Sequence, residues 1–286
     1  MAYNVSVIGF GDNVVDKYEH IKTMYPGGNA VNFAVYAKKF GAVRSAYMGI
    51  FGNDAEAEHV IECLGNERIE TVKCRQMIGE NGCARVTVIN NDRIFLGSNE
   101  GGIRGEARYV LDRFDLEYIR QFDLLHSGNY CFTERELYKI RNAGVSISFD
   151  FSDDSTDEYY KSVAPLVDFA FMSCSDMKEH EVLERLKAVH ALGPEFVCAS
   201  RGADGCIGYD GSRFYTQPAL PVTRMVETMG AGDSLLTAFL VGYINERKEK
   251  GAVCEEGISR CLYNAAEFAS LVCGYEGAWG YPKIYE

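Results

Sequence analysis

Short apolar runs alternate with amphipathic segments along almost the whole chain, and this alternation constrains the fold more than any other feature. The apolar runs lie at residues 5–9, 45–51, 122–126, 145–149, 167–172 and 196–199. Segments with helical start and stop signals lie between most of them, over residues 29–40, 54–64 and 133–143. Each stops at a glycine, and the last opens with an expected capping box between Thr133 and Glu136. The chain therefore predicts an α/β fold, with a mostly parallel central sheet and helices on both faces.

One segment breaks the alternation and predicts a second, smaller sheet. Residues 83–89 and 93–97 form an expected antiparallel hairpin around the polar turn 90–92. Together with the polar stretch 13–25, the segment 83–99 is expected to form a β-sheet lid that closes over a cleft and excludes water. The alternative is an ordinary solvated hairpin. We expect one domain over residues 1–286, and an exposed lid sheet favours a homodimer formed through it.

The composition excludes several classes of function. A formal net charge of -12, with Lys and Arg scattered along the chain, argues against binding nucleic acid. The ten cysteines include no C-x-x-C pair and the N-terminus has no basic, apolar leader, so a cytoplasmic protein with reduced thiols is expected. No apolar run is long enough for a membrane span, and the five histidines lack zinc-ligand spacing.

A glycine loop near the C-terminus indicates chemistry on phosphate. Residues 228–233 lie between an apolar run at 222–226 and an amphipathic segment at 235–244, and predict a strand, a loop and a helix that begins at or near Asp233. Backbone amides at a helix N-terminus bind anions, so Gly230, Ala231 and Gly232 are candidates for an anion hole. Asp233 would then be the general base that takes a proton from a hydroxyl. The alternative is that Asp233 only caps the helix.

Polar residues near the N-terminus are candidates for binding the acceptor. Asp12 and Asp16 follow the first predicted strand, and Asn32 lies one turn inside the first helix. Their oxygens and amides suit the hydroxyls of a polyol, whereas Asn29 is expected to cap that helix. No P-loop occurs, and Val14 breaks the dinucleotide-binding glycine pattern, so the phosphates must be held another way, and the start of the helix at Asp233 is the best candidate.

The motifs Gly27-Gly28-Asn29-x-x-Asn32 and Gly230-Ala231-Gly232-Asp233, in this order and separation, resemble those of the PfkB or ribokinase-like carbohydrate kinases. The resemblance covers nearly the whole chain. It implies a ribokinase-like fold with a β lid, ATP as phosphate donor and Mg²⁺ as counter-ion. It also implies that Asp233 is the general base and that the amides of 230–232 form the anion hole.

The resemblance also implies roles for further residues. Those matched to substrate binding are Asp16, Gly27, Gly28 and Asn32. Those matched to nucleotide binding are Ser173, Ser200, Gly202, Gly205 and Asn264, although Asn264 would serve equally as a helix-surface amide. Gly277 and Ala278, with Pro282, resemble a terminal loop that often lies near a monovalent cation such as K⁺.

Two departures from the family pattern concern the metal. The N-x-x-E motif of the family aligns with Ser173-Cys174-Ser175-Asp176, and Glu227 stands where Asp is common. Asp176 keeps a carboxylate, but on a shorter side chain, and Ser173 lacks an amide. These changes predict a weakened or rearranged Mg²⁺ shell around Asp176.

Several runs resemble the bacterial branch of the family that phosphorylates fructoselysine, most specifically Asp150-Phe151-Ser152-Asp153. This resemblance implies that the acceptor is the 6-hydroxyl of fructoselysine or of a related fructosyl amino acid. Such a substrate carries a secondary ammonium group, which Asp12 or Glu100 would meet. Two alternatives remain open: a kinase for another sugar or nucleoside, such as ribose, fructose or adenosine, and a non-catalytic sugar-binding regulator on the same fold.

Overall fold

The computed structural model describes residues 2–89 and 92–286, and a nine-stranded sheet forms its centre. In spatial order the strands are β13 (Phe214–Gln217), β12 (Cys206–Tyr209), β11 (Phe196–Ser200), β10 (Phe169–Ser173), β9 (Ser146–Asp150), β8 (Leu124–Gly128), β1 (Tyr3–Gly11), β4 (Ala42–Phe51) and β5 (Arg75–Gln76). Neighbours from β11 to β5 pair in parallel, and only β12 and β13 at one edge pair antiparallel. The predicted mostly parallel sheet is confirmed.

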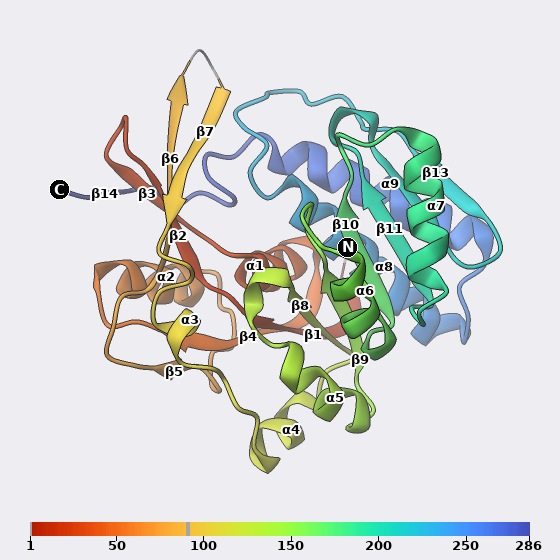
Figure 1. Ribbon diagram of the computed structural model, residues 1–286, viewed down its shortest axis with the longest axis horizontal. Coiled ribbons are helices and arrows are strands. Elements are labelled where there is room, and N and C mark those ends of the chain that lie inside the picture. The colour runs from red at the N-terminus through yellow and green to blue at the C-terminus, as the bar shows by residue number, and fades with distance from the viewer. Residues whose placement is uncertain (1, 90–91) are drawn as a thin grey trace.

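Helices cover both faces of this sheet (Figure 1). One face packs against α1 (Asn29–Phe40), α8 (Ala231–Lys250) and α9 (Glu255–Val272). The other packs against α4 (Arg113–Ile119), α5 (Glu134–Asn142), α6 (Asp157–Val163) and α7 (Glu179–His190). α2 (Ala55–Asn66) packs with α1 in a third cluster, and α3 (Ile103–Glu106) and the 3-10 turns η1 (Asn129–Cys131), η2 (Ala164–Leu166) and η3 (Gly202–Asp204) complete the fold.

The sequence of β1 explains why two separate cores form. Val5 and Val7 belong to the cluster on the α1 and α8 side, whereas Ile8 and Phe10 belong to the cluster on the opposite side. Successive side chains of a strand point to opposite faces, so a strand that is apolar throughout must be covered on both. The sheet is therefore covered on both faces.

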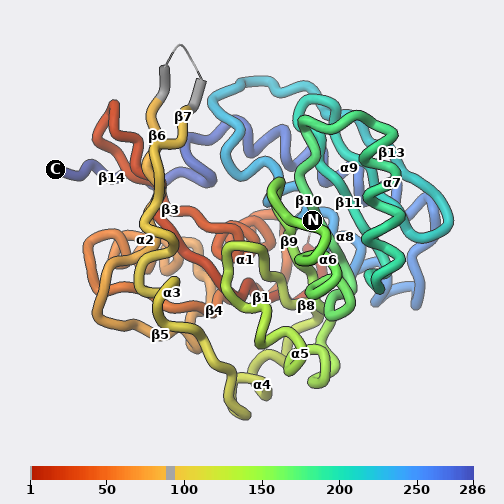
Figure 2. The backbone as a smooth tube through the Cα atoms, in the orientation of Figure 1, coloured from red at the N-terminus to blue at the C-terminus, as the bar shows by residue number. Residues whose placement is uncertain are grey.

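A smaller five-stranded sheet stands at one side of this body (Figure 1). Its strands, in order, are β14 (Lys283–Ile284), β3 (Thr23–Gly27), β2 (Val14–Tyr18), β6 (Gly82–Ile89) and β7 (Asp92–Ser98). The predicted hairpin is present as the antiparallel pair β6 and β7, while residues 90 and 91 of its turn lie outside the described residues. Figure 2 shows the C-terminal segment running to this sheet, where β14 pairs with β3.

The segment before the glycine loop differs from the prediction. Residues 222–226 form no strand, and Met225 is 60% exposed. Pro218 and Pro221 remove two backbone donors just before these residues. The segment runs as a loop along the end of α9, where Val226 N–H donates to Cys273 O. Helix α8 also begins earlier than predicted, at Ala231, with Gly230 as its N-cap residue.

The predicted capping box at Thr133 is wrong. Thr133 Oγ1 shares a 2.5 Å hydrogen bond with Ser127 Oγ, and Glu136 accepts from Leu111 N–H instead of reaching back to the helix start. Both side chains are buried, and each forms its hydrogen bond with a residue outside the helix. The Thr-x-x-Glu spacing does not reveal such partners. The second helix also continues one residue past Gly65, to Asn66.

All ten cysteines are free thiols. Within residues 2–89 and 92–286, no helix combines the length and apolar character that a bilayer crossing demands.

Candidate active site

Asp233 lies in the first turn of α8, and two asparagine amides hold its carboxylate. Asn29 Nδ2 donates to Asp233 Oδ1 at 2.9 Å, and Asn32 Nδ2 donates to Asp233 Oδ2 at 2.7 Å. Both asparagines stand in the first turn of α1. The Asp233 side chain therefore does not cap its own helix, and the N-terminal turns of two helices meet at one carboxylate.

Asn29 connects this carboxylate to a second one. Its amide nitrogen also donates to Asp150 Oδ2 at 3.0 Å, and its oxygen pairs with His126 Nε2 at 2.9 Å. Burial lowers the pKa of His126 to about 3, so the ring is neutral. Because the Asn29 nitrogen donates to the two carboxylates, its oxygen accepts from His126 Nε2–H, and Nδ1 is left to accept from Ser148 Oγ at 3.0 Å. The amide of Asn29 is thus oriented with its nitrogen toward both carboxylates.

Sequence reasoning did not assign Asp150, His126 or Ser148 to the site, and expected Asn29 to cap α1. That expectation is wrong: Asp12 caps the helix, because its two oxygens accept from Asn29 N–H at 2.8 Å and Ala30 N–H at 2.7 Å. Asp150 could have been proposed from its place in the sequence. It is the last residue of β9, and ligands of α/β sheets bind at such strand ends.

Both buried carboxylates have raised pKa values. Burial and the nearby Asp233 charge raise the pKa of Asp150 to about 7. Burial raises the pKa of Asp233 to about 6, although the amides of Asn32 and Asn29 oppose that shift. A carboxylate with a pKa near neutrality is suited to accepting a proton from a hydroxyl and releasing it later.

A groove of about 450 Å³ begins beside this carboxylate pair. Of the predicted nucleotide residues, it is lined by Ser173, Ser200, Gly202 and Gly205, together with Ala231 and Gly232 of the glycine loop. A second hollow of about 120 Å³ is lined by Asp150 and shares Ser173, Ser200 and Gly232 with the groove. Gly232 therefore stands where the two hollows meet, one residue before Asp233.

The glycine loop turns sharply into α8. Gly230 has φ 73°, and a Cβ there would lie 2.0 Å from Tyr36 Oη, so only glycine fits without displacement. Gly232 has nothing within 4 Å of an added Cβ, which leaves open space at this backbone. Ala231 N–H donates to Thr228 O at 3.2 Å. An anion that binds this amide would therefore have to replace only this long hydrogen bond.

The predicted acceptor residues gather at the start of α1. Gly28 has φ 109° and its added Cβ would meet the Asp12 carbonyl at 3.1 Å, while a Cβ on Gly27 would lie 2.8 Å from Asp16 Oδ2. Asp16 is buried on β2. The structure thus brings Asp12, Asp16, Gly27 and Gly28 into one cluster beside Asn29.

The C-terminal loop is tied to the same helix and to the small sheet. Trp279 Nε1 donates to Asn32 Oδ1 at 2.9 Å. Glu227 accepts hydrogen bonds from Tyr18 Oη of β2 and from Gly277 N–H. The glutamate that departs from the family pattern therefore joins the small sheet, the glycine loop and the C-terminal loop.

Three predicted residues lie outside both the acceptor cluster and the lining of the two hollows. Asn264 is on α9 but does not line the groove, which uses Ala266 and Ala269 of that helix. Glu100 is exposed just before α3. Asp176 is exposed beyond β10, and no group of three or more His, Cys, Asp or Glu side chains suited to a metal occurs among the described residues.

A helix N-terminus beside a carboxylate of raised pKa, opening on a long groove at the strand ends of an α/β sheet, defines a phosphotransferase that acts on hydroxyl groups. The sequence model described as pfkB family carbohydrate kinase matches residues 4–283. The chain therefore belongs to the pfkB family of carbohydrate kinases, and the predicted activity, an ATP-dependent carbohydrate kinase, is confirmed at this level.

Individual relatives agree with this family. The chain is 41% identical over 282 residues to the fructosamine kinase FrlD of Bacillus subtilis, covering 98% of this chain and 95% of the relative. It is 31% identical over 270 residues to the fructoselysine 6-kinase of Escherichia coli, covering 94% and 97%. Ribokinase from Giardia lamblia has a TM-score of 0.82 at 15% identity, covering 96% and 94%. Arabidopsis thaliana ribokinase, in a complex with ribose and ATP, has a TM-score of 0.76 at 20% identity, covering 97% and 95%. These structures confirm the ribokinase-like fold.

Proposed function

We propose that this enzyme transfers the γ-phosphoryl group of ATP to the 6-hydroxyl of fructoselysine or of a related fructosyl amino acid. The main observation behind the proposal is the position of Asp233. Its carboxylate accepts hydrogen bonds from the amides of Asn29 and Asn32, and it follows Gly232, which lines both hollows. The names of two relatives that match 98% and 94% of the chain support the choice of acceptor.

In the proposed reaction the nucleotide lies along the groove and the sugar lies beside Asp16, Gly28 and Asn32. Asp233 takes the proton of the acceptor hydroxyl, whose oxygen attacks the γ-phosphorus as ADP leaves. The amides of Gly230 to Gly232, at the positive end of α8, stabilise the negative charge on the phosphoryl oxygens. A bound Mg²⁺ would offset further phosphate charge, and Asp176 would be the carboxylate that helps to hold it.

The small sheet is proposed to act as a lid that excludes water from the reaction. Tyr18 of β2 donates to Glu227, and Tyr25 of β3 donates to Glu276 at 3.2 Å, so the sheet is tied to both loops that border the site. Ile94, Phe95 and Leu96 of the edge strand β7 are exposed, which supports a homodimer formed through this sheet. A K⁺ ion near the loop at Gly277 is a further part of the proposal.

The acceptor is tested by measuring ADP release with fructoselysine, other fructosyl amino acids, ribose, fructose and adenosine. We expect the highest kcat/KM with a fructosyl amino acid, and activity that requires both the sugar and Mg²⁺. A higher kcat/KM for ribose, fructose or adenosine would assign a different acceptor. Absence of ADP release with all of them would support a non-catalytic regulator instead.

The pH dependence of the reaction tests the role of Asp233. A protonated carboxyl group cannot accept a proton, so kcat/KM is expected to rise as the pH passes through about 6 to 7, where Asp233 and Asp150 lose their protons. Asp150→Asn removes the second ionisable group, so the rise in kcat/KM should narrow to a single ionisation near pH 6, that of Asp233. Initial rates from pH 5 to 9, with folding checked by circular dichroism at each pH, measure this. A flat profile down to pH 5 would contradict the assignment.

A further inference from the structure

A buried arginine near the acceptor site lacks a counter-charge. Arg104 of α3 is only 5% exposed, and its Nε has no hydrogen-bond partner. Its Nη1 donates to Tyr130 O at 2.6 Å. No ion pair found among the described residues involves Arg104, although the chain has 41 acidic residues against 29 basic ones. A buried guanidinium that donates to a backbone carbonyl and pairs with no carboxylate keeps its net positive charge. It also keeps N–H donors that a ligand could use.

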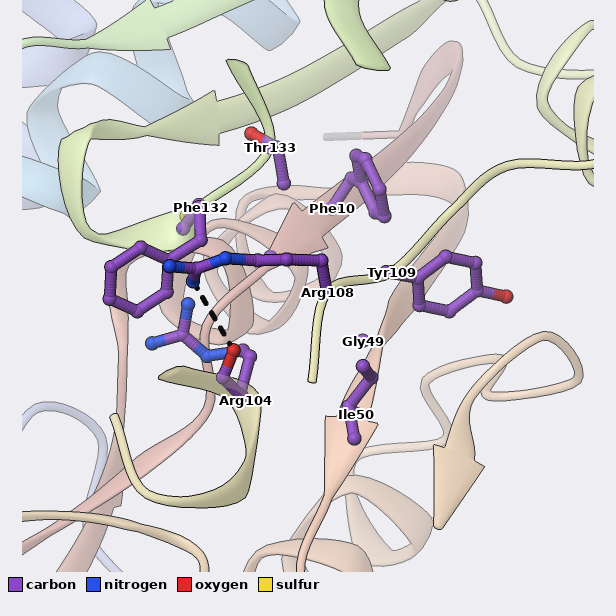
Figure 3. Close-up of a pocket in the computed structure, with 10 residues that line it drawn as sticks. Phe10, Gly49, Ile50, Arg104, Arg108, Tyr109, Phe132 and Thr133 are labelled. Carbon is purple, nitrogen blue, oxygen red and sulfur yellow. Dashed lines mark hydrogen bonds between the residues drawn. The ribbon is translucent and has the colours of Figure 1, made fainter. Parts of the chain in front are cut away.

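A second arginine stands beside it. Arg108 is exposed, and its Nη1 donates to Arg104 O at 3.4 Å. The ring of Phe132 lies 4.8 Å from the Arg104 guanidinium and 4.0 Å from that of Arg108. Figure 3 shows both guanidinium groups beside the Phe132 ring, while Tyr109 points the opposite way. Contact with one aromatic ring holds both cations close to it without neutralising either.

The pocket that these arginines line adjoins the acceptor cluster. Its wall includes Gly11, the residue before Asp12, and Cys131, whose Sγ donates to Asp12 Oδ1 at 3.2 Å. The loop that carries Tyr130 begins at Gly128, where an added Cβ would lie 2.6 Å from Asn29 Oδ1. The ends of β1 and β8 therefore border both the pocket that the arginines line and Asn29, whose amide donates to Asp233.

We propose that Arg104 and Arg108 form a subsite for the carboxylate of the amino-acid part of the acceptor. The inference rests on the proposed function, because a fructosyl amino acid carries such a group and a simple sugar does not. The cavity itself has a volume of only about 10 Å³, so the carboxylate would lie at its mouth, where the exposed Arg108 completes the site. Guanidinium groups bind carboxylates through paired, charge-assisted hydrogen bonds, which the unused donors of Arg104 and Arg108 supply.

The test compares fructoselysine with the fructosyl derivative of cadaverine, which differs by the missing carboxylate. For the parent enzyme, KM is expected to be about 10 to 100 times higher for the cadaverine derivative, with little change in kcat. Arg108→Gln and Arg104→Lys should raise KM for fructoselysine about tenfold and leave KM for the cadaverine derivative unchanged. Arg113→Gln, an exposed arginine at the start of α4, is the matched control and should change neither value.

Each other result would overturn the inference in a distinguishable way. Equal KM values for the two compounds in the parent enzyme, or equal KM increases for both in the variants, would show that the arginines do not read the carboxylate and would leave the proposed function standing. A lower KM for a sugar phosphate such as fructose 1-phosphate would assign the pair to phosphate. Phosphorylation of neither fructosyl compound would reject the proposed function together with the subsite. Because Arg108 is exposed, its variant remains informative even if Arg104→Lys fails to fold.

Discussion

Replacing Asp233 with Asn is expected to lower kcat by about 10² to 10⁴, because the variant loses the general base while keeping the groove that holds the nucleotide. Both carboxylate oxygens of Asp233 accept from amide donors, Asn29 Nδ2 and Asn32 Nδ2. An asparagine at 233 must turn its own NH₂ toward one of them, which costs one hydrogen bond and about 1 to 3 kcal/mol of stability. Steady-state kinetics, ATP titration by calorimetry and thermal unfolding measure the three quantities separately.

The matched control is Asp157→Asn, an exposed carboxylate in the first turn of α6. It should leave kcat and ATP affinity unchanged. An Asp233→Asn enzyme that keeps the parent kcat would remove Asp233 from the proposed role. A loss of ATP binding in parallel with the loss of kcat would instead indicate that the side chain supports the groove and does not act on the proton.

Gly230→Ala is expected to lose stability, whereas Gly232→Ala is expected to keep its stability and lose activity. At Gly230 a methyl group would lie 2.0 Å from Tyr36 Oη in a backbone with φ 73°, so the free energy of unfolding should fall by about 2 to 5 kcal/mol. At Gly232 an added Cβ meets nothing within 4 Å and the backbone is helical, so stability should stay equal or rise by up to about 1 kcal/mol. The Gly232 methyl group would stand where the two hollows meet, and kcat should fall by about 10² as it displaces the phosphoryl group from the amides.

Chemical denaturation and coupled ADP-release assays distinguish these two effects. Gly65→Ala is the control, since Gly65 lies in α2, remote from the groove lining, and also has nothing within 4 Å of an added Cβ. The stability of Gly65→Ala should equal that of Gly232→Ala, and its kcat should equal that of the parent enzyme. Full activity of Gly232→Ala would show that phosphate does not approach this turn, and an unchanged stability of Gly230→Ala would show that Tyr36 moves away at little cost.

The parallel strands and the first helix were predictable because their signals are local. The spacing of apolar residues and the terminal Gly41 place the first helix at residues 29–40, which is where α1 runs. The hairpin of β6 and β7 was predictable for the same reason. The strand predicted at 222–226 failed because an apolar run is ambiguous without its neighbours, and here it borders the groove instead of joining the sheet.

From the sequence, only those residues of the candidate site that belong to a short contiguous motif could be proposed. Asp233, Gly230 and Gly232 stand in one motif, whereas Asp150 and His126 are separated from them and from each other in sequence. The positions of Asp176 and Asn264 relative to the groove depend on how far a turn or a helix is rotated, which a single sequence does not encode in any local pattern. The role of Asp12 as the cap of α1 likewise depends on a contact across 17 residues.

By itself, the sequence determined the α/β fold, the family and the glycine loop, since each follows from spacing between near neighbours along the chain. Only the tertiary structure decided that Asn29 orients two carboxylates, that Glu227 fastens the small sheet to the C-terminal loop, and that Arg104 is buried without a carboxylate. The physical reason is that hydrogen bonding and the cost of burying charge depend on which distant residues are brought together, and that is set by packing of the whole sheet.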